Sequence, residues 1–216
     1  MPISNSRAME CIDTLWNISN KGDNIININE FLLNETHAQL QLAMFGFSKK
    51  FEEENNEKIR NMFANSDFEE GKNVVKNLME EIYKSNGHIS EIINERKENK
   101  NRREEVGNGL IFSYAGHDTT GNTLTFLIYE LCKNKTHQKM LQKEVDKFWL
   151  SQDELQMTYK DLKRLPFMTR CIMETLRLWP ALANGTFREL TEDDYVIGKN
   201  NEKVEGSKGT YVQIPN

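Results

Sequence analysis

Ala115-Gly116-His117-Asp118-Thr119-Thr120 interrupts a run of sequence that is otherwise typical of one long helix. Gly116 costs about 1 kcal/mol relative to alanine inside a helix, and Asp118 competes for backbone hydrogen bonds. The hydroxyl of Thr119 can donate to the carbonyl four residues earlier, that of Ala115, which bends a helix. A helix selected for stability alone would avoid these residues. The stretch therefore predicts a small polar notch with a functional role.

Apolar residues on both sides of the notch recur at helical spacing. They are Val106, Leu110 and Tyr114 before it, and Leu124, Leu127, Ile128 and Leu131 after it. The pattern predicts a single helix from Arg102 to Lys133, which would be roughly 45 to 50 Å long. The notch would lie near its middle.

A second bounded helix is predicted over residues 165–180. Pro166 suits a first helical turn, and Pro180 prevents the helix from continuing. Its apolar stripe consists of Met168, Ile172, Thr175 and Trp179, with Cys171 and Leu176 beside it. Glu174 and Arg177 are three residues apart on another face and can form an ion pair.

The remaining chain is less regular. Residues 51–87 read as helical with a break near residues 65–67, and residues 94–105 read as a solvated connector with charges of alternating sign. After Trp179, residues 195–197 and 210–214 predict two strands of a small sheet. The expected fold class is mainly α with a minor β component.

Composition excludes several classes of protein. The chain has 216 residues, of which 38% are hydrophobic and 28% charged, as in an ordinary globular domain. A net charge of −5, without a basic stripe that carries aromatic residues, argues against a nucleic-acid partner. The amino end has no hydrophobic run of the kind that forms a signal peptide or a membrane anchor, so we expect neither in this chain.

Cysteine and histidine usage points to a reducing compartment and to no zinc site. Cys11, Cys132 and Cys171 lack paired spacing, and the four histidines are scattered along the chain. We therefore predict no metal ligand among these residues.

The two helical motifs, in this order and at this separation, resemble the cytochrome P-450 family of haem-thiolate monooxygenases. That family carries AGxDTT in its long distal helix and ExxR in its proximal helix. Residues 161–167 and 174–180 are similar to its DLxxLPF…ETLRLxP run, and residues 45–51 to the FGxxF that closes its fifth helix. The resemblance implies that residues 1–216 form a single incomplete domain, from helix D to helix K plus the start of the small β-sheet.

The sequence departs from the family pattern at the haem ligand. The family requires a loop of the form FxxGxRxCxG whose thiolate binds the haem iron, and none of the three cysteines lies in such text. The arginine that would complete a triad with Glu174 and Arg177 is absent as well. We therefore expect an interior fragment of the family that binds haem weakly, if at all, by itself.

The resemblance assigns Asp118 and Thr119 to proton delivery during oxygen activation. Thr119 would hold the oxygen species or a water by hydrogen bonding, and Asp118 would relay protons from solvent. The alternative reading of the same residues is a solvated carboxylate and a hydroxyl bonded to its own helix.

The resemblance also places residues around the cofactor. Ala115 and Gly116 would face the distal side of the haem, with His117 turned away, and Arg188 would bind a propionate. Small residues equally permit a close helix contact, and Arg188 is also compatible with a surface position balanced by Glu189 and Glu192.

Glu174 and Arg177 would form a structural clamp in the core of the intact family. The alternative is an exposed ion pair that contributes little to stability.

For the intact parent protein, the resemblance implies insertion of one oxygen atom of O2 into a small organic substrate. Electrons would come from NAD(P)H through a redox partner of the reductase or ferredoxin type. Because this chain lacks the thiolate, we expect it to be inactive alone. The alternative is a non-catalytic remnant or a helical interaction protein derived from the same fold. An unrelated helical bundle is a third possibility, and it would require both motifs to be coincidental.

Overall fold

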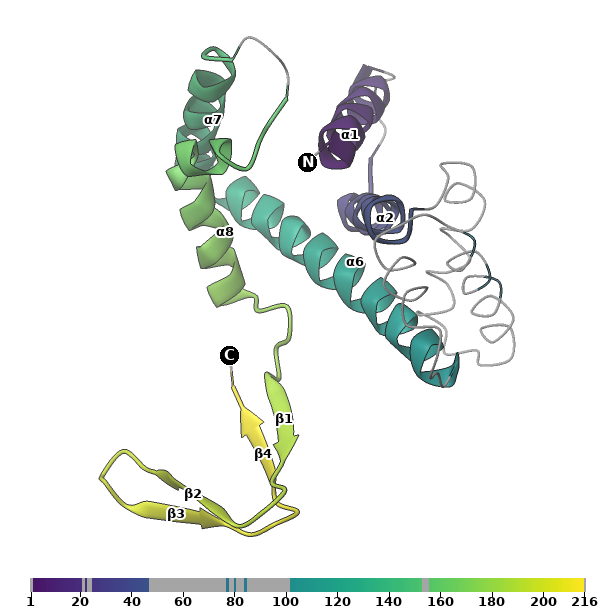
Figure 1. Ribbon diagram of the computed structural model, residues 1–216. Helices are drawn as coiled ribbons and strands as arrows, with labels where there is room; N and C mark the ends of the chain where they lie inside the picture. The colour runs from purple at the N-terminus through teal and green to yellow at the C-terminus, as the bar shows by residue number, and fades with distance from the viewer. Residues whose placement is uncertain are drawn as a thin grey trace.

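The computed structural model describes residues 2–20, 22, 25–46, 77, 80, 84, 102–152 and 156–215. The helices are α1 (Pro2–Asn20), α2 (Ile28–Leu40), α6 (Arg102–Lys133), α7 (Lys135–Trp149) and α8 (Pro166–Leu178), with a π-helical turn over Gln41–Phe45 and a 3-10 turn over Asp161–Arg164. The strands are β1 (Thr186–Glu189), β2 (Asp194–Ile197), β3 (Lys203–Gly206) and β4 (Tyr211–Ile214). Figure 1 shows the helices packed on one another and the strands beyond the end of α8. The predicted mainly α class with a minor β component is confirmed.

Two sequence predictions fall on residues that are not described. Residues 51–87, apart from helical residues 77, 80 and 84, lie outside the described part of the chain. The same holds for residues 94–101 of the charged connector and for the side chains of Val106 and Leu110.

Helix α6 begins and ends at the predicted residues and crosses the helical part of the molecule (Figure 1). The Thr119 hydroxyl donates to the carbonyl of Ala115 at 2.8 Å, as expected, and the Thr120 hydroxyl donates to that of Gly116 at 3.1 Å. Both threonine hydroxyls of the notch are thus bonded to carbonyls of α6 itself.

Helix α2 packs across α6 at glycines. A Cβ atom added to Gly121 would lie 2.7 Å from Cδ2 of Leu33, and one added to Gly116 would lie 3.0 Å from both Cδ atoms of Leu40. The interface is also polar, because the Asn29 amide donates to the side chains of Asn122 and Thr125. Glycine at these positions lets the two backbones approach closely.

Helix α8 confirms the second predicted helix. Pro166 occupies its first turn, and Glu144 of α7 accepts hydrogen bonds from the backbone N–H groups of Phe167 and Met168 at 2.8 and 2.9 Å. A carboxylate at a helix amino end bonds its unpaired N–H groups and interacts favourably with the helix dipole. At the other end, the Trp179 ring stacks on Phe126 of α6 with centroids 4.5 Å apart.

The prediction of one small sheet was wrong in its pairing. Both predicted strands are present as β2 and β4, but β1 pairs with β4 and β2 pairs with β3, each antiparallel. Strands β1 and β3 were missed because short, exposed strands show no alternation of apolar and polar residues. Gly185 leads into β1 with a φ of +67°, and a Cβ there would collide with the carbonyl oxygen of Ile214.

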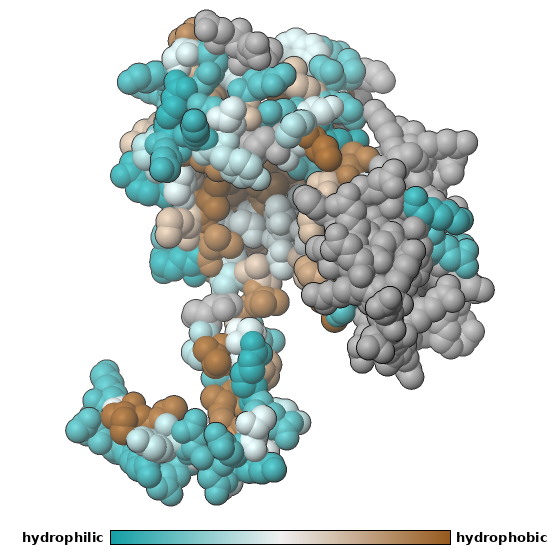
Figure 2. Space-filling view, in the orientation of Figure 1, coloured by the Kyte–Doolittle hydropathy of each residue, from teal (hydrophilic) through white to brown (hydrophobic). Residues whose placement is uncertain are grey.

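Burial in the described part of the chain is more polar than apolar. The buried apolar residues are Ala38, Phe148 and Leu165, whereas the buried polar ones are Glu35, Thr36, His37, Gln41, Ser113, His117 and Thr175. Figure 2 shows hydrophobic side chains exposed on the strands. None of the described helices is long and apolar enough to cross a membrane.

Candidate functional site

Ala115 and Thr119 lie on the side of α6 that faces away from α2. Thr119 is about 200° around the helix from His117, whose side chain is buried against α2. Ala115 is one turn before Thr119 and is exposed, while Asp118 and Thr119 are partly exposed. This open strip of α6 combines a methyl group, a hydroxyl and a neighbouring carboxylate.

Gly116 lies against α2. Its nearest side chain is Leu40, so the close helix contact that a small residue permits is present. A role for Gly116 at a cofactor stays a prediction.

His117 belongs to a buried polar cluster between α2 and α6. Its ring lies 4.6 Å from that of His37, and its Nδ1 is 2.7 Å from the carbonyl oxygen of Ser113, which assigns the proton to Nδ1. Nε2 of His37 lies 3.3 Å from Oγ of Ser113 and 3.2 Å from the Gln41 amide nitrogen. Sequence reasoning missed His37, Ser113 and Gln41 because the cluster joins two helices, and the contact of His37 with Ser113 spans 76 positions of the chain.

Glu174 and Arg177 form an ion pair with two hydrogen bonds of 2.7 Å. Their side chains are 56% and 66% exposed, which corresponds to the exposed alternative. The hydrogen bond from Arg177 lowers the pKa of Glu174, and the Glu174 carboxylate raises the pKa of Arg177. The role of the pair as a buried clamp in the intact family stays a prediction.

Arg188 lies on β1 and is exposed. Its Nη1 donates to the carbonyl of Phe187 at 2.9 Å. This hydrogen bond stays within β1, which is the surface alternative, and the role of Arg188 as a propionate ligand stays a prediction.

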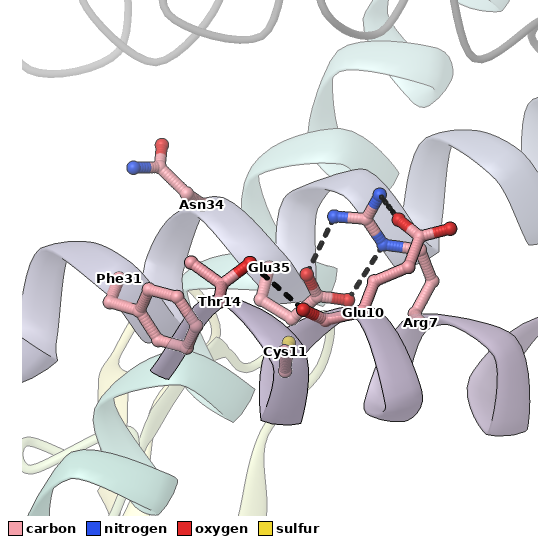
Figure 3. A pocket seen from close by; sticks show the side chains of 7 residues that line it. All are labelled: Arg7, Glu10, Cys11, Thr14, Phe31, Asn34 and Glu35. Carbon is pink, nitrogen blue, oxygen red and sulfur yellow. Dashed lines mark hydrogen bonds and ion pairs between the residues drawn. The ribbon is translucent and has the colours of Figure 1, made fainter. Parts of the chain in front are cut away.

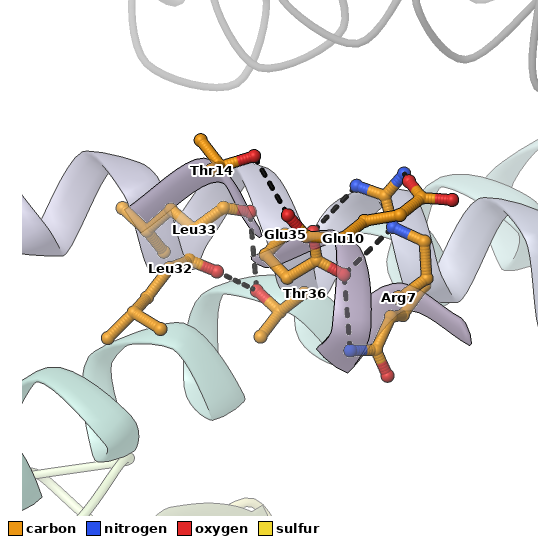
Figure 4. Close-up of polar contacts among 8 residues, drawn as sticks. Arg7, Glu10, Thr14, Leu32, Leu33, Glu35 and Thr36 are labelled. Atoms are coloured by element: carbon orange, nitrogen blue, oxygen red, sulfur yellow. Dashed lines mark hydrogen bonds and ion pairs between the residues drawn. The ribbon is translucent and has the colours of Figure 1, made fainter. Parts of the chain in front are cut away.

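A second polar group joins α1 to α2. Arg7 donates two hydrogen bonds to Glu35, at 2.9 and 2.6 Å, and a third to Glu10 at 3.0 Å (Figure 4). The cavity beside it has a volume of about 170 Å³ and is lined by Arg7, Glu10, Cys11, Thr14, Phe31, Asn34 and Glu35 (Figure 3). Because the Arg7 guanidinium is bonded to both carboxylates, this group anchors α1 on α2.

Two of the described cysteines lie in surroundings that favour the neutral thiol. Burial, followed by the nearby Glu35 carboxylate, raises the pKa of Cys11 to about 12, and burial also raises the pKa of Cys171. Cys132 is exposed near the end of α6. Among the described residues, no three side chains of His, Cys, Asp or Glu are grouped to hold a metal ion.

The sequence model of the cytochrome P450 family matches residues 4–215. The chain belongs to the cytochrome P450 family. The resemblance inferred from the two helical motifs is therefore confirmed.

Several cytochromes P450 are similar to part of this chain. Probable cytochrome P450 6d4 of Drosophila melanogaster is 39% identical over 105 residues, 49% of this chain and 19% of that protein. Cytochrome P450 6A1 of Musca domestica is 32% identical over 106 residues, 49% of this chain and 21% of that protein. Cytochrome P450 4F11 of Homo sapiens is 38% identical over 69 residues, 32% of this chain and 13% of that protein. The matches thus span about a fifth or less of these relatives.

A solved structure shares the fold. The crystal structure of the cytochrome P450 CYP102L1 superposes with a TM-score of 0.73 at 19% identity, covering 98% of this chain and 52% of that chain. At this identity the similarity concerns the fold alone.

The cytochrome P450 family implies a haem in the parent protein, and the α6 residues expected on its oxygen side have the chemistry for that position. Ala115 is exposed and Thr119 partly exposed on the side of α6 that faces away from α2, and their side chains are small. The thiolate side has no assigned ligand, because none of the three cysteines lies in the loop pattern that the family uses, and burial favours the neutral thiol at Cys11 and Cys171.

Proposed function

We propose that this chain supplies the oxygen-side helix of a haem monooxygenase in which Asp118 and Thr119 handle protons. The observation that carries the proposal is the strip of α6 facing away from α2, where Ala115 is exposed and the Thr119 hydroxyl is bonded to the Ala115 carbonyl. Haem, when bound beside this strip, would supply the chemistry that inserts one oxygen atom of O2 into a small organic substrate.

The bond to Ala115 determines what Thr119 can do. A hydroxyl has one proton, and that of Thr119 is directed to the Ala115 carbonyl at 2.8 Å. The lone pairs of Oγ1 are left to accept a hydrogen bond. We therefore infer that Thr119 holds a water as an acceptor, and that its hydroxyl must rotate about the Cβ–Oγ1 bond and release the Ala115 carbonyl before it can donate to that water.

Asp118 is the residue that can exchange protons with solvent. Its side chain is partly exposed, and no hydrogen bond to its carboxylate is formed within the described residues. A carboxylate one residue from Thr119 can pass a proton to a water held at Oγ1.

The rest of the proposed function concerns the intact parent. Electrons would come from NAD(P)H through a redox partner, Arg188 would bind a haem propionate, and Glu174 with Arg177 would act as a clamp once other segments cover them. By itself the 216-residue chain would be inactive, because none of its three cysteines lies in the loop pattern from which the family supplies the haem thiolate.

The test uses a whole P450 that contains this chain. Thr119→Ala should lower the product formed per NAD(P)H consumed by about 10²-fold, the lower end for loss of positioned proton transfer. Thr119→Ser should retain most of the product formed per NAD(P)H consumed. Asp118→Asn should slow turnover and change the pH profile of turnover. The matched control is Thr120→Val, which removes the neighbouring hydroxyl bonded to Gly116 and should leave coupling unchanged.

Unchanged coupling in Thr119→Ala would contradict the proposal. A separate measurement addresses the chain alone, reconstituted with haem and a reductase. Substrate-dependent product at a normal rate would overturn the proposed inactivity.

A further inference from the structure

Thr36 is an α2 residue whose side chain reaches the backbone of α6. It is buried, and its Oγ1 lies 3.0 Å from the carbonyl oxygen of His117. The same Oγ1 lies 3.0 Å from the carbonyl oxygen of Leu32 and 3.2 Å from that of Leu33, both in the preceding turn of α2 (Figure 4). Three carbonyls therefore surround one hydroxyl, which has one proton to donate.

Helix geometry indicates which carbonyl receives that proton. The distances from Thr36 to Leu32 and Leu33 are set within α2, because a threonine hydroxyl in a helix routinely lies near these carbonyls. The distance to His117 is set by the approach of two separate helices. Two oxygens without a proton between them repel, and the helices could relieve that repulsion by moving apart. An approach of 3.0 Å in a buried interface indicates attraction, with the proton directed to His117.

The orientation of the His117 carbonyl also sets the orientation of the backbone at Asp118. This oxygen and the amide nitrogen of Asp118 belong to one planar peptide group. The ring of His117 is held as well, by the carbonyl of Ser113 and by the neighbouring ring of His37. His117 is thereby tied at both its backbone and its ring, and the peptide leading into Asp118 has little freedom to rotate.

Gly121 provides the space that this contact needs. It is the residue whose amide bonds the His117 carbonyl in a regular helix. A Cβ on Gly121 would lie 3.1 Å from Oγ1 of Thr36 and 3.1 Å from the Cα of Leu33. The absence of a side chain at this position lets the hydroxyl reach the carbonyl beside that amide.

We propose that Thr36 is a positioning residue for the Asp118–Thr119 turn, acting through a hydrogen bond from its hydroxyl to the carbonyl oxygen of His117. This inference rests on the proposed function, because that turn matters to the reaction only if its side chains handle protons. Thr36 touches no reacting atom. It fixes the peptide group from which Asp118 projects.

The test on the unmodified 216-residue chain is a measurement of scalar coupling through the hydrogen bond. With carbon-13 at the His117 carbonyl, coupling to the Thr36 hydroxyl proton is expected. Coupling to the carbonyl of Leu32 or Leu33 in its place would overturn the proposal, whether or not any variant folds.

Variants of the same chain provide the second readout. Thr36→Val keeps the shape and removes the hydroxyl, so the infrared band of the labelled His117 carbonyl should move to higher frequency. The amide hydrogens of Asp118 and Thr119 should exchange about tenfold faster, as for the loss of one hydrogen bond. Thr36→Ser keeps the hydroxyl and should restore both signals.

The matched control is Thr14→Val in α1. The Thr14 hydroxyl donates to the carbonyl of Glu10 at 2.8 Å within its own helix, so this variant removes a bond of the same kind that does not cross to α6. It should leave the His117 band and the two exchange rates unchanged. An unshifted band in Thr36→Val, or an equal shift in Thr14→Val, would overturn the proposal. Neither readout requires haem or turnover, so the failure of the oxygenase proposal in the whole enzyme would be seen separately.

Discussion

The thiol of Cys11 lies between α1 and α2, beside the carboxylate of Glu35. Burial and that negative charge raise its pKa to about 12, so the thiol stays protonated at any pH where the chain is handled. The thiolate is the reactive form. Exposed Cys132 should therefore react first with a disulfide reagent at pH 8, and Cys11 should react last.

The order of reaction is measured by stopping the labelling at intervals and mapping the modified peptides. Cys132→Ser should remove the fast phase and leave the slow ones. Labelling should accelerate in urea, since unfolding returns Cys11 to its ordinary pKa. Modification of Cys11 at the rate of Cys132 in the folded chain would show that the α1–α2 contact is open.

At single residues, the sequence predicted contacts within a helix and missed those between helices. The bond from Thr119 to the Ala115 carbonyl follows from a spacing of four residues, and the structure contains it. The bond from Thr36 to His117 joins residues 81 positions apart, for which one sequence offers no spacing rule. The same limit applies to Gly116, whose small size was noted but whose partner, Leu40, was not.

At the scale of elements, the crossing of α2 and α6 depends on Gly121. Alanine there would place its Cβ 2.7 Å from Cδ2 of Leu33 and 3.1 Å from the Leu33 Cα, so the backbone of α2 would have to shift. Overpacking of this kind costs about 1–3 kcal/mol, of which the better helix propensity of alanine recovers at most about 1 kcal/mol. Gly121→Ala should therefore lower the free energy of unfolding in urea.

Gly107 supplies the control within the same helix. A Cβ there meets nothing within 4 Å, so Gly107→Ala should gain roughly 0.5–1 kcal/mol from helix propensity alone. Equal effects of the two substitutions would mean that α2 does not pack closely at Gly121.

The start of α8 depends on Glu144 of the preceding helix. Its carboxylate accepts from the N–H groups of Phe167 and Met168, which have no acceptor within α8. Glu144→Ala should lower the free energy of unfolding by about 0.5–2 kcal/mol, the usual range for the loss of a helix cap. Unfolding in urea followed by circular dichroism measures the change.

Asp146→Ala is the matched control, because it removes an exposed carboxylate from the same helix. The carbonyl of Asp146 accepts a hydrogen bond from the N–H of Leu150, and this backbone bond survives the substitution. If Asp146→Ala lowered the free energy of unfolding as much as Glu144→Ala does, the negative charge of α7 would be the cause, and not the cap of α8.

The bounds of α6 were predictable from apolar periodicity, and those of α8 from periodicity together with the prolines at positions 166 and 180. The pairing of strands was not. Strand β3 reads Lys-Val-Glu-Gly, which sequence patterns assign to a loop, and its partner β2 was predicted as a strand of the same sheet as β4. Strand partners are set by loop paths and tertiary contacts, which short polar segments do not encode locally.

At the scale of the whole molecule, the described chain corresponds to about half of a P450 fold. It covers 52% of the solved P450, and many large apolar side chains on its strands are exposed (Figure 2). The motifs predicted membership of the family. The amount of apolar surface that is exposed could not be predicted, because it depends on which faces of the strands and helices pack against other elements.

The exposed strands β2 and β3 should make the chain self-associate. Val196 and Val204 are direct cross-strand partners, 64% and 50% exposed, so together they present an apolar face on a two-stranded ribbon with open edges. Exposed apolar patches and unpaired edges favour association between copies. The double variant Val196→Lys with Val204→Glu replaces this pair by opposite charges, which keeps the strands paired and leaves the net charge unchanged.

Sedimentation velocity over a range of concentrations should show association that this variant reduces and that the control Val204→Ile retains. Equal association of the double variant and the parent chain would locate the contact on another face, and the helices would then be the place to search.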